Sequence, residues 1–224
     1  MEDSLALLHQ LQVQQVTDLV LTPHFHSDKK SLDQFLLDRE LAFTRFLETA
    51  DTTMRFFLGA EVYGNEFLLI SKQIDSLCIR GTNLLLLEMP FTDEWTSDSW
   101  RMIRKITDDH AILPVIAHAE RYPALRKHPV KLLNRLIDAG CVIQANCDSF
   151  VEPATQGLML RCLGDGLFHL LGTDCHDVHK RPPRMTEACE VITRAWGAGM
   201  LDRLEANGAR LLSGKPLRGQ NLFF

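Results

Sequence analysis

Six short apolar runs alternate along the chain with longer segments whose apolar residues recur at helical spacing. Within each short run the apolar residues are continuous, as in parallel strands that are buried on both faces. The predicted strands cover residues 18–22, 55–61, 83–88, 113–117, 141–146 and 168–173. The predicted helices cover residues 31–50, 97–109, 129–139, 153–163, 183–196, 200–207 and 209–212.

Alternation of strands and helices predicts a parallel sheet with right-handed crossovers. Such a sheet is either open and doubly wound or curled into a barrel. No GxGxxG motif follows any of the predicted strands, so the pattern does not support a dinucleotide-binding sheet. The positions of the polar residues favour an α/β barrel.

Five of the six predicted strands end in a residue that can bind a metal ion. The carboxyl ends of the strands of a parallel barrel meet at one opening, so these residues are expected to share a pocket. The candidate ligands are His24, Glu61, Glu88, His118, Asp174 and His176. Imidazole and carboxylate without thiolate suit manganese, iron or zinc, with magnesium as a further alternative.

Two arginines follow predicted ligands and are candidates for binding a substrate anion. Arg121 lies three residues after His118, and Arg181 lies five residues after His176. A guanidinium group matches the geometry of phosphate oxygens. Surface ion pairs, for Arg121 with Glu120, are the alternative interpretation. Between Asp174 and His176, strand-like alternation points the Cys175 side chain away from both, as a wall residue.

Composition narrows the class of protein. The 224 residues, 46% of them apolar, fit a single domain spanning residues 1–224, and a formal charge of −5 argues against a nucleic-acid partner. The longest apolar stretches have strand length, and the acidic N-terminus does not resemble a signal peptide, so no membrane insertion is expected. Six dispersed cysteines predict reduced thiols and a cytoplasmic location.

Five stretches resemble the polymerase-and-histidinol-phosphatase (PHP) superfamily. They are TPHFH at 22–26, GAEVY at 59–63, PVIAHAERY at 114–122, DAGCVIQAN at 138–146 and GTDCHDVHKRPPRM at 172–185. More narrowly, they resemble the bacterial tyrosine phosphatases encoded with capsule and exopolysaccharide machinery. That resemblance implies a distorted (β/α)7 barrel with up to three metal ions, commonly manganese. It also implies phosphomonoester hydrolysis by metal-activated water and a tyrosine-phosphorylated partner, a bacterial tyrosine kinase of polysaccharide export.

The resemblance also implies roles for individual residues. Glu61, Glu88 and His118 would hold one metal, and Glu61 would bridge to a second that also uses Asp174. A third metal would use His24 and His176. Arg121 and Arg181 match the family's phosphate-binding arginines.

The chain departs from the family at its start. Family members open with a strand that reads roughly D-x-H-x-H, whereas MEDSLALL matches the helix that follows that strand. We therefore expect a barrel that lacks its first strand, with a gap between the strands at 18–22 and 168–173. Either the true start lies further upstream, or the chain is a natural variant without that strand. Strand edges exposed at such a gap have unpaired backbone groups. We therefore expect a displaced segment or a partner chain, as in a homo-oligomer, to cover them.

Three functions remain open at this point. The first is a protein-tyrosine phosphatase, which the HAERY and HKRPP stretches favour. The second is a small-molecule phosphoesterase such as a histidinol phosphatase, which would share the same metal ligands. The third is a catalytically impaired remnant that binds phosphotyrosine without cleaving it.

Overall fold

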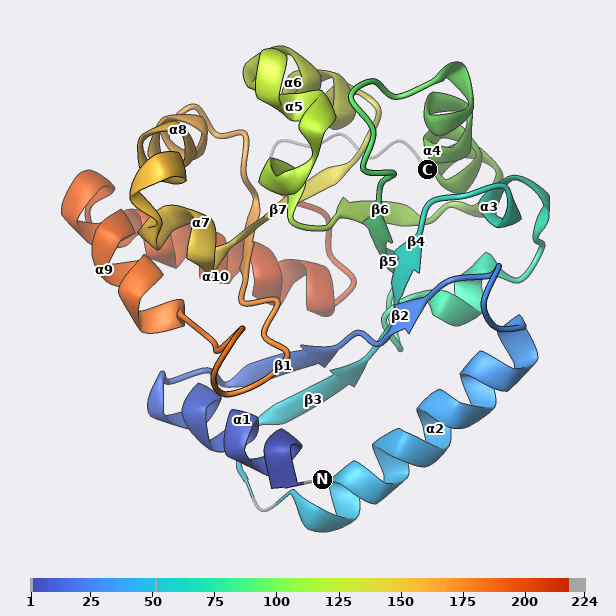
Figure 1. The fold of residues 1–224 in the computed structure, drawn as a ribbon, viewed down its shortest axis with the longest axis horizontal. Coiled ribbons are helices and arrows are strands. Elements are labelled where there is room, and N and C mark those ends of the chain that lie inside the picture. Colours follow the sequence, from blue (N-terminus) through green and yellow to red (C-terminus); the bar gives the residue numbers. More distant parts are fainter. Residues whose placement is uncertain (1, 51, 218–224) are drawn as a thin grey trace.

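Six parallel strands form one curled sheet in the computed structural model, which describes residues 2–50 and 52–217 (Figure 1). In spatial order the strands are β2 (His24–Phe25), β4 (Glu61–Tyr63), β5 (Leu84–Glu88), β6 (Leu113–Ile116), β7 (Val142–Asn146) and β8 (Leu170–Gly172). All neighbouring strands run parallel. The predicted α/β fold, an incomplete barrel of six parallel strands with outer helices, is confirmed and has the form of a curled half-barrel.

The first predicted strand, residues 18–22, forms only β1 (Asp18–Leu21), and the second, residues 55–61, divides into β3 (Arg55–Leu58) and the start of β4. β1 and β3 form a separate parallel pair that leads into β2 and β4. The chain is thus interrupted between β1 and β2 and between β3 and β4. The first interruption falls at Pro23, which has no N–H to donate to a neighbouring strand. Two hydrogen bonds carry the pairing across it, from Gly59 N to the Leu21 carbonyl (2.9 Å) and from Glu61 N to the Pro23 carbonyl (3.1 Å).

The long helices lie where the apolar spacing predicts them, with ends shifted by two residues at most. They are α2 (Leu32–Thr49), α4 (Ser97–His110), α6 (Pro129–Asp138), α8 (Pro153–Gly164) and α9 (Met185–Trp196). The N-terminal segment forms α1 (Glu2–Val13), in agreement with the helix that the family resemblance implies. In the described part of the chain, no helix is long and apolar enough to cross a membrane.

One prediction about the helices is wrong. The segments at 200–207 and 209–212 form a single helix, α10 (Ala198–Leu212). Gly208 does not end the helix, because a glycine inside a helix costs only about 1 kcal/mol. Leu204 before it and Leu211 after it are both buried, so packing holds both halves of the helix against the protein. Several short elements were not predicted because one turn is too short to show a periodicity: α3 (Phe67–Ile70), α5 (Pro123–Lys127), α7 (Cys147–Val151), η1 (Ile74–Leu77) and η2 (Ala119–Arg121).

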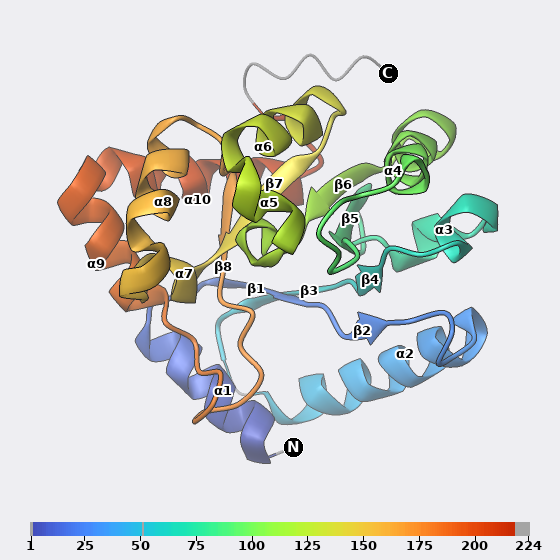
Figure 2. The ribbon, with the colours of Figure 1, turned by 45° about the horizontal axis from the view of Figure 1, so that its top comes forward.

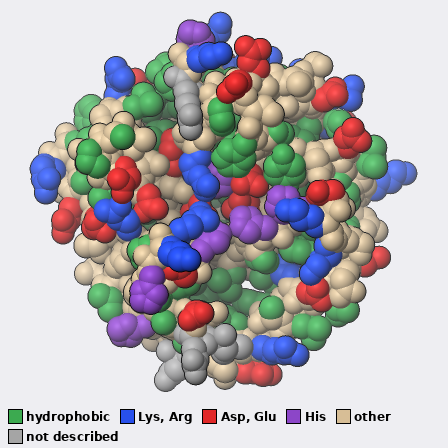
Figure 3. All heavy atoms as spheres, in the orientation of Figure 1, with side chains coloured by type: hydrophobic (Ala, Val, Ile, Leu, Met, Phe, Trp, Pro, Cys, Tyr) green, Lys and Arg blue, Asp and Glu red, His purple; other side chains and the backbone are tan. Residues whose placement is uncertain are grey.

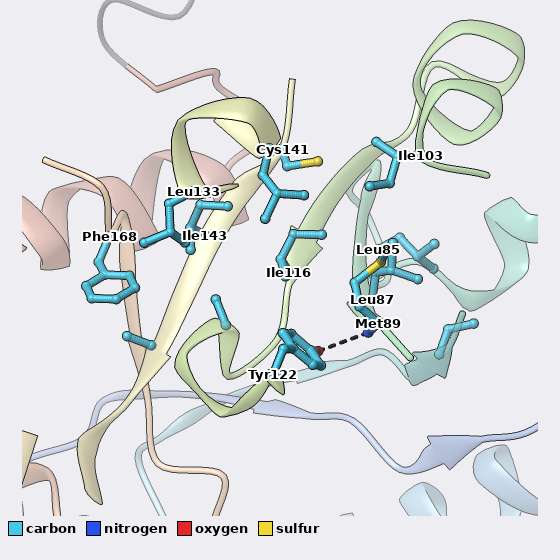
Figure 4. Close-up of a cluster of buried hydrophobic side chains, with 14 of the residues drawn as sticks. Leu85, Leu87, Met89, Ile103, Ile116, Tyr122, Leu133, Cys141, Ile143 and Phe168 are labelled. Carbon is cyan, nitrogen blue, oxygen red and sulfur yellow. Dashed lines mark hydrogen bonds between the residues drawn. The ribbon is translucent and has the colours of Figure 1, made fainter. Parts of the chain in front are cut away.

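Hydrophobic side chains fill the layer between the sheet and its outer helices (Figure 4). Leu85, Ile116 and Ile143 project from β5, β6 and β7, and they pack in one cluster with Ile103 of α4 and Leu133 of α6. Each of these side chains is at most 2% exposed. This layer explains why the strands are apolar on the face that carries them.

The opposite face of the sheet lines a hollow of about 1900 Å³. Alternate strand residues such as Leu84, Leu86 and Val115 face it, and the helices α1, α2, α9 and α10 contribute to the other walls. Within residues 2–50 and 52–217, no backbone pairing joins β1 or β2 to β8. The sheet is therefore open between these strands, in agreement with the predicted gap. Figure 2 shows α1 and α2 on the side of β1 and β3 that faces away from α5 and α6.

Candidate metal centre

Two carboxylates and an imidazole meet beside the central strands. Glu61 begins β4, Glu88 ends β5 and His118 comes two residues after β6. The Nε2 atom of His118 lies 3.2 Å from Glu61 Oε1 and 3.5 Å from Glu88 Oε1. The three side chains are 6%, 13% and 2% exposed, respectively.

The spacing of these donors fits a metal ion. One ligand atom from each of Glu61, Glu88 and His118 lies within 4.8 Å of the others. Ligands at about 2.0–2.2 Å from a tetrahedral or octahedral ion are separated by about 3–4 Å. The structure thus brings together the set that was predicted to hold one complete metal site.

The charges of these side chains also favour a bound cation. Burial by itself would raise the pKa of Glu61, but hydrogen bonds to His118 and His24 outweigh it and hold that pKa at about 2. Burial raises the pKa of Glu88, and the nearby Glu61 charge raises it further. Two carboxylates in one buried pocket repel each other, and a divalent cation between them would remove that repulsion.

His24 joins this group to a second one. Its Nδ1 lies 3.3 Å from Glu61 Oε1 and its Nε2 lies 3.2 Å from His176 Nε2. The hydrogen bond to Glu61 raises the pKa of His24, against the effect of burial. His24, His26 and Glu88 also offer three donors within 4.8 Å. His26 was not among the predicted ligands, although it follows His24 at the two-residue spacing that places side chains on one face of a strand.

Asp174 lies among polar side chains beside the metal group, and its role as a metal ligand stays a prediction. Its Oδ2 accepts hydrogen bonds from Arg121 Nη1 (2.9 Å), from Asn146 Nδ2 (3.0 Å) and from Arg181 Nη2. His176 lies beside it, with Nδ1 2.9 Å from the Asp174 carbonyl oxygen. In the described part of the chain, the two three-residue groups with metal-ligand spacing include neither Asp174 nor His176.

Arg121 and Arg181 lie at the mouth of the site, with side chains 42% and 39% exposed. Figure 3 shows basic, acidic and histidine side chains gathered on one face above a recess with hydrophobic walls. Arg121 pairs with Asp174, not with Glu120. All eight predicted site residues therefore lie in one continuous cluster, and the anion-binding role of the two arginines stays a prediction.

Residues that the sequence did not single out connect the two halves of the cluster. Gln144 Oε1 accepts a hydrogen bond from the His118 backbone N–H (2.7 Å), and its Nε2 donates to Asn146 Oδ1 (2.9 Å). Asn146 in turn holds Asp174. Asn146 is the last residue of β7, the position at which the other predicted strands end in candidate ligands. This position is the sequence feature from which Asn146 could have been predicted as a site residue.

Glu120 is a half-buried structural residue. Its Oε1 accepts hydrogen bonds from the Asn146 backbone N–H (3.2 Å) and from Ser149 Oγ (2.9 Å). Burial raises the pKa of this carboxyl group. Glu120 therefore fixes the turn from β7 into α7.

Cys175 is the wall residue that was predicted. It packs against a hydrophobic cluster that contains Leu8, Leu11 and Met54, and burial raises the pKa of its thiol. Five residues separate it from Arg181, which is the Cys-x5-Arg spacing of phosphatases with a cysteine nucleophile. A reactive cysteine needs a lowered pKa, so Cys175 does not have the environment of a nucleophile.

Two of the candidate ligands have strained backbone conformations. His118 has φ 33° and Asp174 has φ 48°, in the left-handed region that favours glycine. The first follows β6 and the second follows β8, so the chain turns sharply as it leaves each strand.

The family profile described as "Capsular polysaccharide synthesis, CpsB/CapC" matches residues 1–213. The chain belongs to the CpsB/CapC family. Within this family it is 30% identical to the tyrosine-protein phosphatase CpsB of Streptococcus pneumoniae over 229 residues, which cover 93% of this chain and 89% of that protein. It is 26% identical to the tyrosine-protein phosphatase YwqE of Bacillus subtilis, over 99% of this chain and 86% of that protein.

A solved structure shares the CpsB/CapC fold. It comes from work on YwqE of Bacillus subtilis and CpsB of Streptococcus pneumoniae, described as unique metal-dependent tyrosine phosphatases. The TM-score is 0.83 at 22% sequence identity, and the match covers 98% of this chain and 90% of that one.

Proposed function

We propose that this chain is a metal-dependent phosphatase that hydrolyses phosphotyrosine in proteins of capsular or exopolysaccharide synthesis. The observation that carries the proposal is the buried group of Glu61, Glu88 and His118, with two arginines at its mouth. The relatives CpsB and YwqE are named tyrosine-protein phosphatases, which supports the same activity.

Each part of the cluster has a role in this proposal. Glu61, Glu88 and His118 would hold a divalent cation, manganese or alternatively iron, zinc or magnesium. Such a cation supplies Lewis acidity and activates water when it is bound. Arg121 and Arg181 bind phosphate oxygens through the same guanidinium N–H groups that now contact Asp174.

His24, Asp174 and His176 complete the proposed site. His24 lies between Glu61 and His176, so it is placed to hold a further cation together with His176. Asp174 orients both arginines toward the mouth. Release of these ion pairs to an incoming phosphate would leave Asp174 free to act as a ligand.

The proposal extends to the setting in which the protein acts. The chain works as one metallophosphatase domain over residues 1–224, and its partner is a tyrosine-phosphorylated protein, a bacterial tyrosine kinase of polysaccharide export. All six cysteines are free thiols, which supports a reducing compartment, the cytoplasm. The open sheet between β1 and β8 supports a homo-oligomer in which a second copy covers the strand edges.

The test compares two phosphorylated substrates and two variants. Protein purified without chelator is analysed for bound metal and is then assayed on a phosphotyrosine peptide and on histidinol phosphate, with each candidate metal and with EDTA. We expect metal-dependent hydrolysis of the peptide. Glu61→Gln removes a ligand charge and should lower the activity at least about a hundredfold. The matched control Glu66→Gln changes an exposed carboxylate outside the cluster and should leave it unchanged.

Other outcomes would support the competing functions. A preference for histidinol phosphate would identify a small-molecule phosphoesterase. Tight binding of the phosphotyrosine peptide without turnover, with every metal, would identify a binding protein. Absence of both metal uptake and peptide binding would contradict the proposal altogether.

A further inference from the structure

Phe91 is an exposed aromatic side chain beside the metal group. It lies three residues after Glu88, in the loop between β5 and α4, and it is 43% exposed. Its ring centroid is 6.0 Å from that of His118, with an angle of 26° between the two ring planes. The guanidinium carbon of Arg121 lies over the same ring, 5.7 Å from its centroid.

The loop that carries Phe91 is held firmly from below (Figure 4). Tyr122 is fully buried, and its hydroxyl accepts a hydrogen bond from Met89 N and donates one to the Ala117 carbonyl, both at 2.9 Å. Its ring contacts Phe91 at a centroid distance of 5.0 Å. Trp95, whose ring contacts that of Tyr122 at a centroid distance of 5.5 Å, donates from Nε1 to the Pro90 carbonyl (3.0 Å). These contacts anchor the loop directly before Phe91.

The position of this ring has a chemical meaning. In an aryl phosphate the aromatic ring is joined to phosphorus through a single oxygen. If phosphorus lies between the metal group and Arg121, the substrate ring falls within the range of Phe91, since aromatic pairs interact at centroid separations of about 4.5–7 Å. An alkyl phosphate such as phosphoserine places an sp³ carbon there and offers no ring to stack.

The other exposed large side chains have no such relation to the cluster. Trp196, 49% exposed, lies on α9 and donates its Nε1 hydrogen to the Leu160 carbonyl. Leu37 and Leu41 lie on α2. Phe91 alone among the exposed large hydrophobic side chains of the described residues contacts both a candidate metal ligand and a candidate phosphate-binding arginine.

We infer that Phe91 determines specificity for aryl phosphates, because its exposed ring packs against the phenyl ring of phosphotyrosine while Arg121 binds the phosphate. This inference rests on the proposed function and names the residue that would separate phosphotyrosine from phosphoserine. It also accounts for an apolar ring left exposed at the mouth of a charged site.

The first test measures discrimination between two peptides of one sequence that carry either phosphotyrosine or phosphoserine. Phe91→Ala should lower kcat/KM on the phosphotyrosine peptide about ten- to a hundredfold, since it removes the stacking and the area buried by one ring. Its kcat/KM on the phosphoserine peptide should change less than about twofold, within the usual effect of an exposed substitution. Phe91→Tyr keeps the ring and should keep the discrimination. The control Leu41→Ala shortens a similarly exposed side chain on α2 and should behave as wild type.

The second test does not depend on turnover. Binding of phenylphosphonate and methylphosphonate to the metal-loaded protein is measured by calorimetry. Phe91→Ala should weaken phenylphosphonate binding about tenfold and leave methylphosphonate binding unchanged. Equal effects of the substitution on both phosphonates, or no effect on either, would overturn the inference. If the wild type hydrolyses neither peptide, the proposed function fails, and the phosphonate comparison still decides the role of Phe91.

Discussion

Acid should lower the stability of the protein through one half-buried imidazole outside the metal centre, that of His169. His169 lies directly before β8, and its Nδ1 accepts a hydrogen bond from the backbone N–H of Ile143 at 2.9 Å. The acceptor role requires a neutral ring with its proton on Nε2. Burial lowers the pKa of His169 from 6.5 to about 4, and the charge of Arg203 adds to the effect.

The sign and size of the effect follow from this pKa. Between pH 4 and pH 6.5 His169 binds a proton in the unfolded chain but stays neutral in the folded chain. The free energy of unfolding therefore falls as the pH falls through this window. The full loss for a difference of about 2.5 pKa units is about 3 kcal/mol. At about pH 5 the same relation gives a loss of about 2 kcal/mol relative to neutral pH.

A variant that keeps the acceptor but cannot titrate isolates this contribution. In His169→Asn the amide oxygen takes the place of Nδ1, and the hydrogen bond from Ile143 remains. The free energy of unfolding is measured in urea, with EDTA present, at about pH 7.5 and about pH 5. The wild type should lose about 2 kcal/mol more than this variant between the two conditions.

A second variant checks the hydrogen bond itself. His169→Phe leaves the Ile143 N–H without a partner and should cost about 1–3 kcal/mol at both pH values. Equal pH dependence of the wild type and His169→Asn would refute the argument, because His169 would then not be the group that acid protonates.

Three further predictions concern stability. Manganese at about a hundred times its dissociation constant should stabilise the protein by about 2.7 kcal/mol in thermal unfolding, and Glu61→Gln should abolish most of that gain. Tyr122→Phe removes two buried hydrogen bonds, one donated and one accepted, so urea unfolding should show a loss of about 1–3 kcal/mol. A Cβ atom at Gly164 would lie 2.3 Å from the Trp196 ring, whereas one at Gly157 in the same helix meets nothing within 4 Å. Gly164→Ala should therefore lower the melting temperature, and Gly157→Ala should raise it by stabilising the helix by about 0.5–1 kcal/mol.

The sheet could be predicted because its strands are apolar throughout and its strand ends are chemically distinctive. The last four runs lie in the six-stranded sheet as predicted, whereas the first two lie mainly in the separate β1–β3 pair. Parallel pairing brings Glu61, Glu88 and His118 close together wherever the outer helices lie. The break between β1 and β2 could also have been inferred from Pro23, since a proline inside a strand breaks its ladder.

The remaining features depend on side-chain directions that a one-dimensional pattern does not contain. Whether Asp174 contacts a metal or two arginines depends on the conformations of long side chains from two different loops. The contribution of His26 depends on how the short strand β2 is tilted against its neighbours. The joining of two predicted segments into α10 depends on burial of Leu204 and Leu211, and tertiary packing overrides the weak helix preference of Gly208.

The left-handed backbone at the candidate ligands His118 and Asp174 lowers thermal stability at positions that the proposed activity requires. A non-glycine residue in this region costs about 1–2 kcal/mol, and a glycine at either position would avoid that cost. Selection for thermal stability alone would therefore favour glycine at these two positions, and glycine has no side chain to bind a metal ion. A screen of randomised libraries by melting temperature should enrich glycine at these two positions and select variants without activity. A useful screen of this protein therefore has to measure turnover in the same step.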